Sequence, residues 1–186
     1  MNSTPFKLMA WISVGLILLA IGTSISMAYQ RRMVLKQITV TYLGEEEHRD
    51  HSIPLYKRKE ALPDYTIELQ HTDRGTVKLD THLDQSALEG LTWTLSELYS
   101  CKDIPTIRLY DEDKIISEDL AEIAFDGQPV TENDYQFEFE LETSFETGLA
   151  SFWKTPVGTA IIWAFGALVL LFLLSLLAPI MIHKMD

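Results

Sequence analysis

One uninterrupted apolar stretch constrains this chain more than any other feature. Residues 157–182 read VGTAIIWAFGALVLLFLLSLLAPIMI and contain no ionisable side chain. With a rise of about 1.5 Å per residue, a helix needs about 20 apolar residues to cross the hydrocarbon core of a bilayer. Trp153 and Lys154 precede the stretch, and His183 and Lys184 follow it, as is typical of membrane interfaces. The stretch therefore predicts a transmembrane helix.

A second apolar segment covers residues 8–28, LMAWISVGLILLAIGTSISMA, and follows a short polar leader with one basic residue, Lys7. The small residues Ser26 and Ala28, spaced around Met27, form a site of the kind that signal peptidase cuts. The segment is nevertheless longer than the apolar core of a signal peptide, which has about 7 to 15 residues. These properties favour an uncleaved, signal-anchor-like transmembrane helix over a cleaved signal peptide.

Two membrane helices with one domain between them put both chain ends on the same side. The expected boundaries are a polar N-terminus (1–7), a first helix (8–28), a basic juxtamembrane linker (29–36), an acidic domain (37–143), a second linker (144–156), a second helix (157–182) and a polar C-terminus (183–186). More basic residues flank the helices on the domain side than on the other side, which favours a cytoplasmic domain. Large domains translocate largely regardless of charge, however, and the chain opens like an export signal. We expect both termini in the cytoplasm and the domain on the extracytoplasmic side.

The charge of the chain is concentrated between the two apolar segments. Of its 27 Asp and Glu residues, 26 lie between Glu45 and Glu146, against 15 Lys and Arg in the whole chain. Such an acidic domain would be repelled by nucleic acid and by anionic lipid, and it favours cations and basic protein surfaces as partners. The single cysteine, Cys101, has no intrachain partner for a disulfide.

Between the helices the sequence alternates between apolar and polar residues with a period of two. This pattern is typical of strands with one buried and one solvated face. It is clearest at residues 38–42, 65–69, 91–95 and 135–141. Further strands are expected at residues 76–83, 106–110 and 122–125, with an additional candidate at 53–57 and one short helix near 85–89. Seven or eight short strands at this spacing predict an antiparallel β-sandwich or barrel, and we expect the sandwich.

Residues 64–127 resemble the calcium- and phospholipid-binding sandwich domain of synaptotagmin and protein kinase C. The resemblance rests on the strand that follows Asp64, the strand that contains Trp93, and a loop reading Asp111-Glu112-Asp113 with Asp119 six positions after Asp113. It implies a calcium site formed by Asp64, Asp111, Asp113 and Asp119. Several carboxylates at short spacing suit this ion, because calcium takes six to eight oxygen ligands. The alternative is that residues 111–119 form a solvated acidic turn, as charge clusters in acidic domains usually do.

The remaining motifs give little support for catalysis. His48 and His51 have a spacing compatible with metal ligation, but no second ligand pair follows, and a polar loop explains them. Cys101 with His71 or His82 would make a nucleophile and a base, yet the local signatures of cysteine enzymes are missing. The sequence contains no Gly-rich phosphate loop and no His-Glu-x-x-His motif. We therefore expect no enzymatic activity and no catalytic or cofactor-binding residues.

Three functions are compatible with these observations. The first is a non-catalytic, membrane-anchored interaction or structural subunit whose acidic sandwich binds another membrane or extracytoplasmic protein within a larger membrane complex. The second is a calcium-responsive binding module held at the membrane. The third is an accessory subunit of a transporter or membrane enzyme. The first requires no catalytic residues, and it is the function that the sequence favours.

Overall fold

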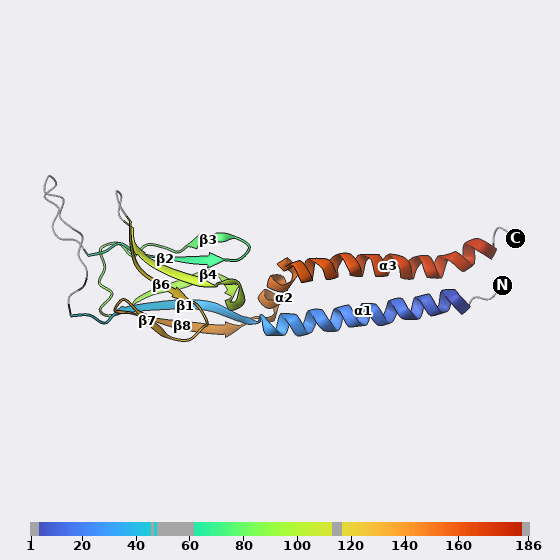
Figure 1. Ribbon diagram of the computed structural model, residues 1–186, viewed down its shortest axis with the longest axis horizontal. Coiled ribbons are helices and arrows are strands. Elements are labelled where there is room, and N and C mark those ends of the chain that lie inside the picture. Colours follow the sequence, from blue (N-terminus) through green and yellow to red (C-terminus); the bar gives the residue numbers. More distant parts are fainter. Residues whose placement is uncertain (1–3, 46, 48–61, 113–116, 184–186) are drawn as a thin grey trace. The chain divides into compact units, whose positions relative to one another are not determined.

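The computed structural model describes residues 4–45, 47, 62–112 and 117–183 (Figure 1). The chain divides into two compact units. Residues 1–32 and 148–186 form a helical unit, and residues 33–147 form a β unit. The expected strand at 53–57 lies outside the described residues.

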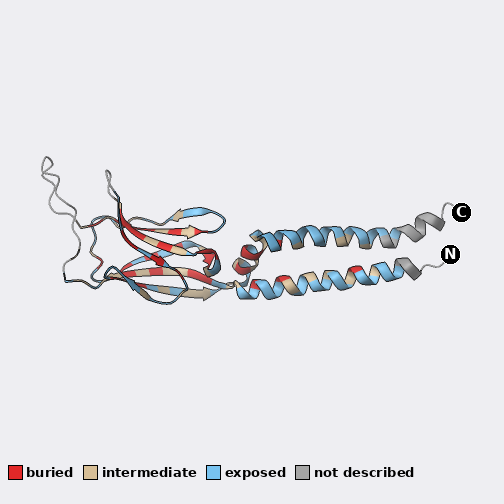
Figure 2. Ribbon diagram, viewed as in Figure 1, coloured by how far each residue is buried: buried red, intermediate tan, exposed pale blue. Residues whose placement is uncertain are grey.

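Two long apolar helices make up most of the helical unit. Helix α1 covers Thr4–Gln30 and helix α3 covers Pro156–His183, and the two helices pack against each other. Within them, Lys7–Gln30 and Pro156–Leu174 are long and apolar enough to cross a membrane. Most of their described side chains are exposed (Figure 2). Exposed apolar surface of this extent is characteristic of helices that face lipid or another apolar surface.

A third helix occupies the segment expected to be a linker, residues 144–156. Helix α2 covers Phe145–Lys154 and is capped at its start by Ser144, whose Oγ accepts the backbone N–H of Thr147 at 3.2 Å. Thr155 then caps α3, because its Oγ1 accepts the N–H of Gly158 at 3.0 Å. Pro156 follows as the first residue of α3, a position where its missing N–H costs nothing. Two polar caps and one proline thus convert the expected linker into a helix that ends where the next begins.

The β unit consists of two antiparallel sheets of four strands each, which confirms the predicted β-sandwich arrangement. One sheet has the order β4-β1-β8-β7, and the other has the order β3-β2-β5-β6. Their bounds are β1 Met33–Tyr42, β2 Tyr65–His71, β3 Gly75–Lys78, β4 Leu91–Ser100, β5 Thr106–Asp111, β6 Glu118–Ala124, β7 Val130–Glu132 and β8 Tyr135–Thr143. The first and last strands pair directly, with Met33 opposite Thr143 and Tyr42 opposite Tyr135.

The core lies between the inner faces of the two sheets. Ile38, Val40 and Phe137 contribute from one sheet, and Ile67 and Leu109 contribute from the other, all fully buried. The side chains between them along each strand face outward and are mostly polar, as in the row Glu138, Glu140 and Glu142 of β8. Alternation with a period of two thus places the apolar half of each strand in the interior.

Several element boundaries differ from those expected. Strand β1 begins at Met33, inside the expected basic linker 29–36, because Met33 and Val34 already pair with Thr143 and Glu142 of β8. Strand β3 ends at Lys78 rather than reaching residue 83, and β6 begins at Glu118 rather than 122. Strand β7 was not predicted, since three residues are too few for an alternating pattern to be recognised.

The prediction of a short helix near residues 85–89 is wrong. This segment is a turn, in which the N–H of Gly90 bonds to the carbonyl of Ala87 at 3.2 Å. Five residues are too few to stabilise a helix without tertiary support, because helix nucleation is unfavourable. The N–H of Ala87 and the hydroxyl of Ser86 instead donate to the Glu47 carboxylate.

Candidate functional site

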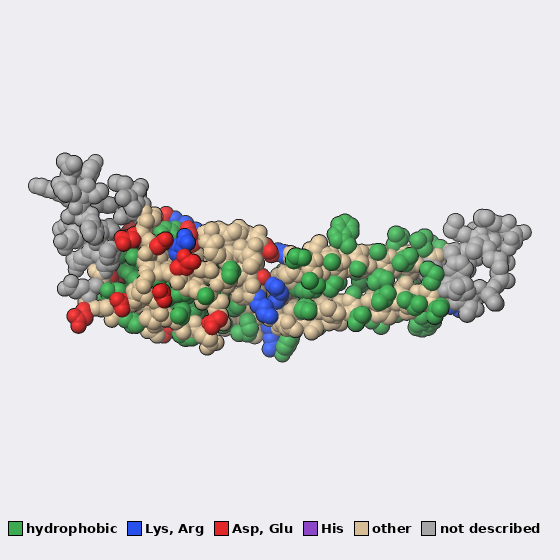
Figure 3. All heavy atoms as spheres, viewed as in Figure 1, with side chains coloured by type: hydrophobic (Ala, Val, Ile, Leu, Met, Phe, Trp, Pro, Cys, Tyr) green, Lys and Arg blue, Asp and Glu red, His purple; other side chains and the backbone are tan. Residues whose placement is uncertain are grey.

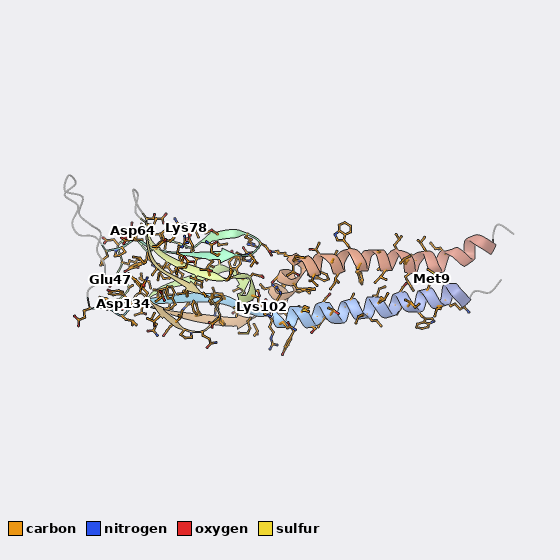
Figure 4. All side chains as sticks on the ribbon, viewed as in Figure 1. Met9, Glu47, Asp64, Lys78, Lys102 and Asp134 are labelled. Carbon is orange, nitrogen blue, oxygen red and sulfur yellow. The ribbon has the colours of Figure 1, made fainter. Side chains whose placement is uncertain are left out.

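One end of the sandwich, which we call the loop end, carries the last residues of β1, β3, β5 and β7 and the first residues of β2, β4, β6 and β8. Met33 of β1 and Thr143 of β8 lie at the opposite end, as do the connections β2–β3, β4–β5 and β6–β7. Figure 4 shows Glu47, Asp64 and Asp134 at the loop end and Lys102 at the other. The sandwich as a whole is strongly acidic, with 10 Lys and Arg against 26 Asp and Glu in residues 33–147, a net charge of −16. Figure 3 shows acidic side chains spread over one of its faces.

Two of the four aspartates predicted as calcium ligands meet at this loop end. The backbone N–H of Asp64 donates to Oδ1 of Asp111 at 2.7 Å, and the N–H of Glu112 donates to the carbonyl of Asp64 at 2.9 Å. The Asp64 carboxylate in turn accepts the N–H of Asp84 at 2.8 Å. Asp111 is only 3% exposed. Both carboxylates therefore join neighbouring loops through backbone hydrogen bonds.

Of the other two predicted ligands, the structure describes only Asp119. Asp113 lies outside the described residues. Asp119 lies in β6 on the exposed side of the sheet, where Oδ1 is 3.7 Å from Nε of Arg108. Among the residues that the structure describes, no three His, Cys, Asp or Glu side chains are grouped as a metal site would require. The predicted set of four ligands stays a prediction.

Glu47 forms a second polar centre at the loop end. Its Oε1 accepts the hydroxyl of Tyr65 at 2.6 Å and the N–H of Ala87 at 2.6 Å, and its Oε2 accepts the hydroxyl of Ser86 at 2.7 Å. One half-buried carboxylate thus fixes the segment that follows β1, the turn before β4 and a core tyrosine. The sequence contained no signal for this arrangement, because Glu47 and Ala87 are 40 residues apart.

The two tyrosines beside Glu47 are held in the neutral form. The hydroxyls of Tyr65 and Tyr135 lie 3.4 Å apart, and both side chains are almost fully buried. Burial raises the pKa of Tyr135 to about 12. Burial, followed by the hydrogen bond to Glu47, also raises the pKa of Tyr65. Both phenols are therefore hydrogen-bond donors and not bases near neutral pH. This arrangement is suited to stabilising the fold rather than to catalysis.

The cysteine and the described histidines do not form a nucleophilic pair. Burial raises the pKa of the Cys101 thiol to about 11, which keeps it in the unreactive protonated form. Nδ1 of His71 accepts the N–H groups of Asp73 and Arg74 in the β2–β3 turn. His82 instead packs edge-on against Trp93, with ring centroids 4.6 Å apart. His48 and His51 lie outside the described residues.

Strand β3 is an edge strand of one sheet and β4 is an edge strand of the other. A groove of about 410 Å³ lies between them. We call it the β3–β4 groove. Its lining includes Val77 and Leu79 from the β3 side, and Trp93 and Leu95 from β4. Because β3 and β4 are outermost among the described strands, each has one backbone edge that no other described strand covers. The groove therefore combines apolar side chains with free strand edges.

The backbone of β4 faces the groove at alternate residues. His82 Nε2 lies 3.2 Å from the carbonyl oxygen of Thr92, which places that carbonyl on the edge opposite β1. Thr94, two residues further along, directs its backbone groups the same way, since backbone directions alternate along a strand. Trp93 is fixed between them because its Nε1–H donates to the Asp80 carbonyl at 2.7 Å. An extended peptide laid beside β4 would meet the Thr94 backbone first.

Some charged side chains in and beside the β3–β4 groove form ion pairs, and one does not. Lys78 pairs with Glu112, and both Nη atoms of Arg74 donate to the Glu97 carboxylate at 2.7 Å. Asp80 also lines the groove, and among the described residues its carboxylate has no ion pair or hydrogen bond. The groove thus keeps one uncompensated negative charge within an acidic domain.

No protein-family model matches this chain, and no curated protein matches it in sequence. Among solved structures, "BON1-C2B" is similar at 9% identity and a TM-score of 0.41, covering 63% of this chain and 94% of that one. Human GIVD cytosolic phospholipase A2 in complex with methyl gamma-linolenyl fluorophosphonate inhibitor and terbium chloride is similar at 19% identity and a TM-score of 0.34. That match covers 59% of this chain but only 18% of the phospholipase. Likenesses this distant carry no argument about ligand or activity, and the sandwich stands on its own strand pairing.

Proposed function

We propose that this protein is a two-pass membrane protein whose acidic sandwich binds a partner protein without catalysing a reaction. The membrane placement is supported by the two apolar helices, which each offer enough length to cross a bilayer. Both termini are then cytoplasmic and the sandwich is extracytoplasmic. Protease treatment of sealed, right-side-out vesicles tests this orientation, because it should degrade the sandwich only if the domain faces outward.

The observation that carries the binding function is the β3–β4 groove. Its two open strand edges offer backbone partners, and its apolar lining offers burial for alternate side chains of an extended peptide. The unpaired Asp80 and the net charge of −16 favour a positively charged ligand. We therefore assign the groove to an extended segment of the partner in which basic and apolar residues alternate.

A labelled peptide of alternating lysine and valine is expected to bind the full-length protein in detergent, as measured by fluorescence anisotropy. A peptide of alternating glutamate and valine should not bind. The substitution Asp80→Asn should lower the affinity for the lysine peptide about five-fold, since one partly desolvated charge pair contributes about 1 kcal/mol to binding. Raising the salt concentration should weaken it further, because exposed charges are screened.

Glu138→Gln is the matched control for that variant. It removes the same charge from the exposed face of β8, which does not line the groove. If Asp80→Asn and Glu138→Gln weakened the peptide equally, binding would reflect overall charge rather than the groove. Equal binding of the two peptides would remove the proposed preference for a basic partner.

Calcium-responsive binding is the second candidate, and the contact between Asp64 and Asp111 at the loop end favours it. These two carboxylates, with Asp113 and Asp119, would supply oxygen ligands of the kind that calcium prefers. Isothermal titration of the full-length protein should then show heat at or below millimolar calcium, and Asp111→Asn should abolish it. The absence of heat at that concentration would eliminate this candidate. The third expectation, an accessory subunit of a transporter or membrane enzyme, is a special case of partner binding.

A further inference from the structure

Two segments that are far apart in the sequence meet at one end of the helical unit. They are the last turn of α1 with the residues after it, and helix α2. Gly148 makes the approach possible, because a Cβ built on it would lie 2.6 Å from the carbonyl oxygen of Ala28 and 3.0 Å from the backbone nitrogen of Arg32. The backbones are therefore in direct contact at this point.

This contact brings three basic side chains to the same end of the unit, which we call the basic collar: Arg31, Arg32 and Lys154. Nη1 of Arg31 donates to Oγ of Ser151 at 2.9 Å. Lys154 lies three residues after Ser151, so the two share a face of α2. Figure 3 shows basic side chains gathered at this end of the helices.

The basic collar also carries the aromatic side chains expected at a membrane interface. The guanidinium of Arg32 stacks over the ring of Tyr29, with its carbon 3.5 Å from the ring centroid. Trp153 precedes Lys154 and contacts Phe152. Tyrosine and tryptophan favour the headgroup level of a bilayer, where one side is apolar and the other is wet. The collar is therefore at the depth where lipid phosphates lie, given the membrane placement proposed above.

Two side chains of the collar, Arg32 and Lys154, are the ones that we expect to meet a ligand. Residues 1–32 and 148–186 contain five Lys and Arg and a single acidic residue, Asp186. Within the described part of the chain, neither Arg32 nor Lys154 forms an ion pair. Helix α2 itself carries one acidic residue, Glu146, so the collar has three basic side chains against one carboxylate although the chain as a whole is acidic.

We propose that the basic collar binds the phosphate of an anionic phospholipid. Arg32 would present a planar guanidinium, fixed by Tyr29, to two phosphate oxygens, and Lys154 would add a flexible point charge. Charge-assisted hydrogen bonds of this kind form with a lipid phosphate in either leaflet, so the proposal holds for a collar on the extracytoplasmic side. The inference rests on the membrane placement of the proposed function, and it is independent of the β3–β4 groove.

The test uses the full-length protein in neutral detergent and native mass spectrometry to count bound lipids. Phosphatidylglycerol is expected to bind more tightly than phosphatidylcholine of the same chain length, because its phosphate charge is not cancelled by a cationic headgroup. The double variant Arg32→Gln/Lys154→Gln should lose about 25-fold in phosphatidylglycerol affinity, about five-fold per basic residue. The substitution Arg32→Lys should reduce phosphatidylglycerol affinity less than Arg32→Gln does. Lysine keeps the positive charge and loses only the planar, two-pronged hydrogen bonding of the guanidinium.

Lys7→Gln and Lys102→Gln are the control variants, because they remove basic residues outside the collar. Equal affinity for the two lipids, or equal loss in the controls and the double variant, would overturn the proposal. Displacement of the lipid by inorganic phosphate at low millimolar concentration would show a site for free phosphate instead, and would also overturn it. Failure of the protein to remain in carbonate-washed membranes would instead contradict the membrane placement itself.

Discussion

Replacing Gly148 by leucine is expected to destabilise the helical unit strongly, because it would separate α2 from the end of α1. The new side chain would begin at a Cβ only 2.6 Å from the Ala28 carbonyl oxygen and 3.0 Å from two further backbone atoms. Backbone cannot move aside as a flexible side chain can, so α2 would have to separate from the end of α1. Overpacking of this kind costs about 1 to 3 kcal/mol. Thermal unfolding of the full-length protein in detergent should show it as a lower melting temperature.

Other glycines in the same unit provide the controls for this result. A Cβ built on Gly15, Gly22 or Gly166 meets no other atom within 4 Å. Leucine at Gly15 or Gly166 should therefore leave the melting temperature nearly unchanged. If Gly148→Leu were tolerated as well as these two variants, the close approach of α2 to α1 would be incorrect.

Replacing Glu47 by alanine is expected to be the most damaging change in the sandwich outside its apolar core. It removes the acceptor of three hydrogen bonds, from Tyr65, Ser86 and Ala87. Leaving a buried donor unsatisfied costs about 1 to 3 kcal/mol, and bonds to a carboxylate are stronger than neutral ones. We expect a loss of about 2 to 4 kcal/mol in the free energy of unfolding. Trp93, the only tryptophan in residues 33–147, reports this transition by its fluorescence in urea.

Two further variants separate the role of Glu47 from a general effect of charge. The substitution Glu47→Gln keeps one carbonyl acceptor in a side chain of similar shape. It should therefore lower the free energy of unfolding less than Glu47→Ala does. Glu138→Gln removes an exposed carboxylate and should change stability by less than about 0.5 kcal/mol. A stability of Glu47→Ala equal to that of Glu138→Gln would contradict the structural role assigned to the hydrogen bonds.

The sandwich was predictable because its strands carry their own signal. Residues such as Ile38, Val40 and Phe137 are apolar at every second position, and the structure buries these positions. The antiparallel two-sheet arrangement then follows from many short strands separated by turns. The turn at residues 72–75 also joins two paired strands, with Gly75 at a φ of 73°, which only glycine adopts readily.

Features that depend on distant contacts were not predictable. Helix α2 is a partial exception, because its cap Ser144 is local, but its packing depends on the contact of Gly148 with the end of α1, about 120 residues away. The β3–β4 groove exists because β3 and β4 are the outermost strands of their sheets, and no local pattern reveals the order of strands. The hydrogen bonds of Glu47 likewise require a turn 40 residues away.

The aspartate loop shows how spacing can mislead about side-chain direction. Asp111 and Asp119 occupy neighbouring positions on β5 and β6, whereas the sequence placed Asp119 in the loop before a strand at 122–125. A register shift lies between Leu109 and Tyr110, however, and Asp119 contacts Arg108 on the exposed face. The buried Asp111 instead accepts a backbone N–H. Sequence spacing identified strands in this region but neither the start of β6 nor the face that each carboxylate takes.

The direct pairing of the first and last strands has a mechanical consequence. Met33 and Thr143 form the terminal rung of the β1–β8 ladder, and the chain continues from them into α1 and α2. A force that separated these two chain ends would load that rung alone and open the ladder one hydrogen-bonded pair at a time. Tension applied from the helices would therefore unzip the domain from the end opposite its loops, at a far lower force than shearing two strands along their length.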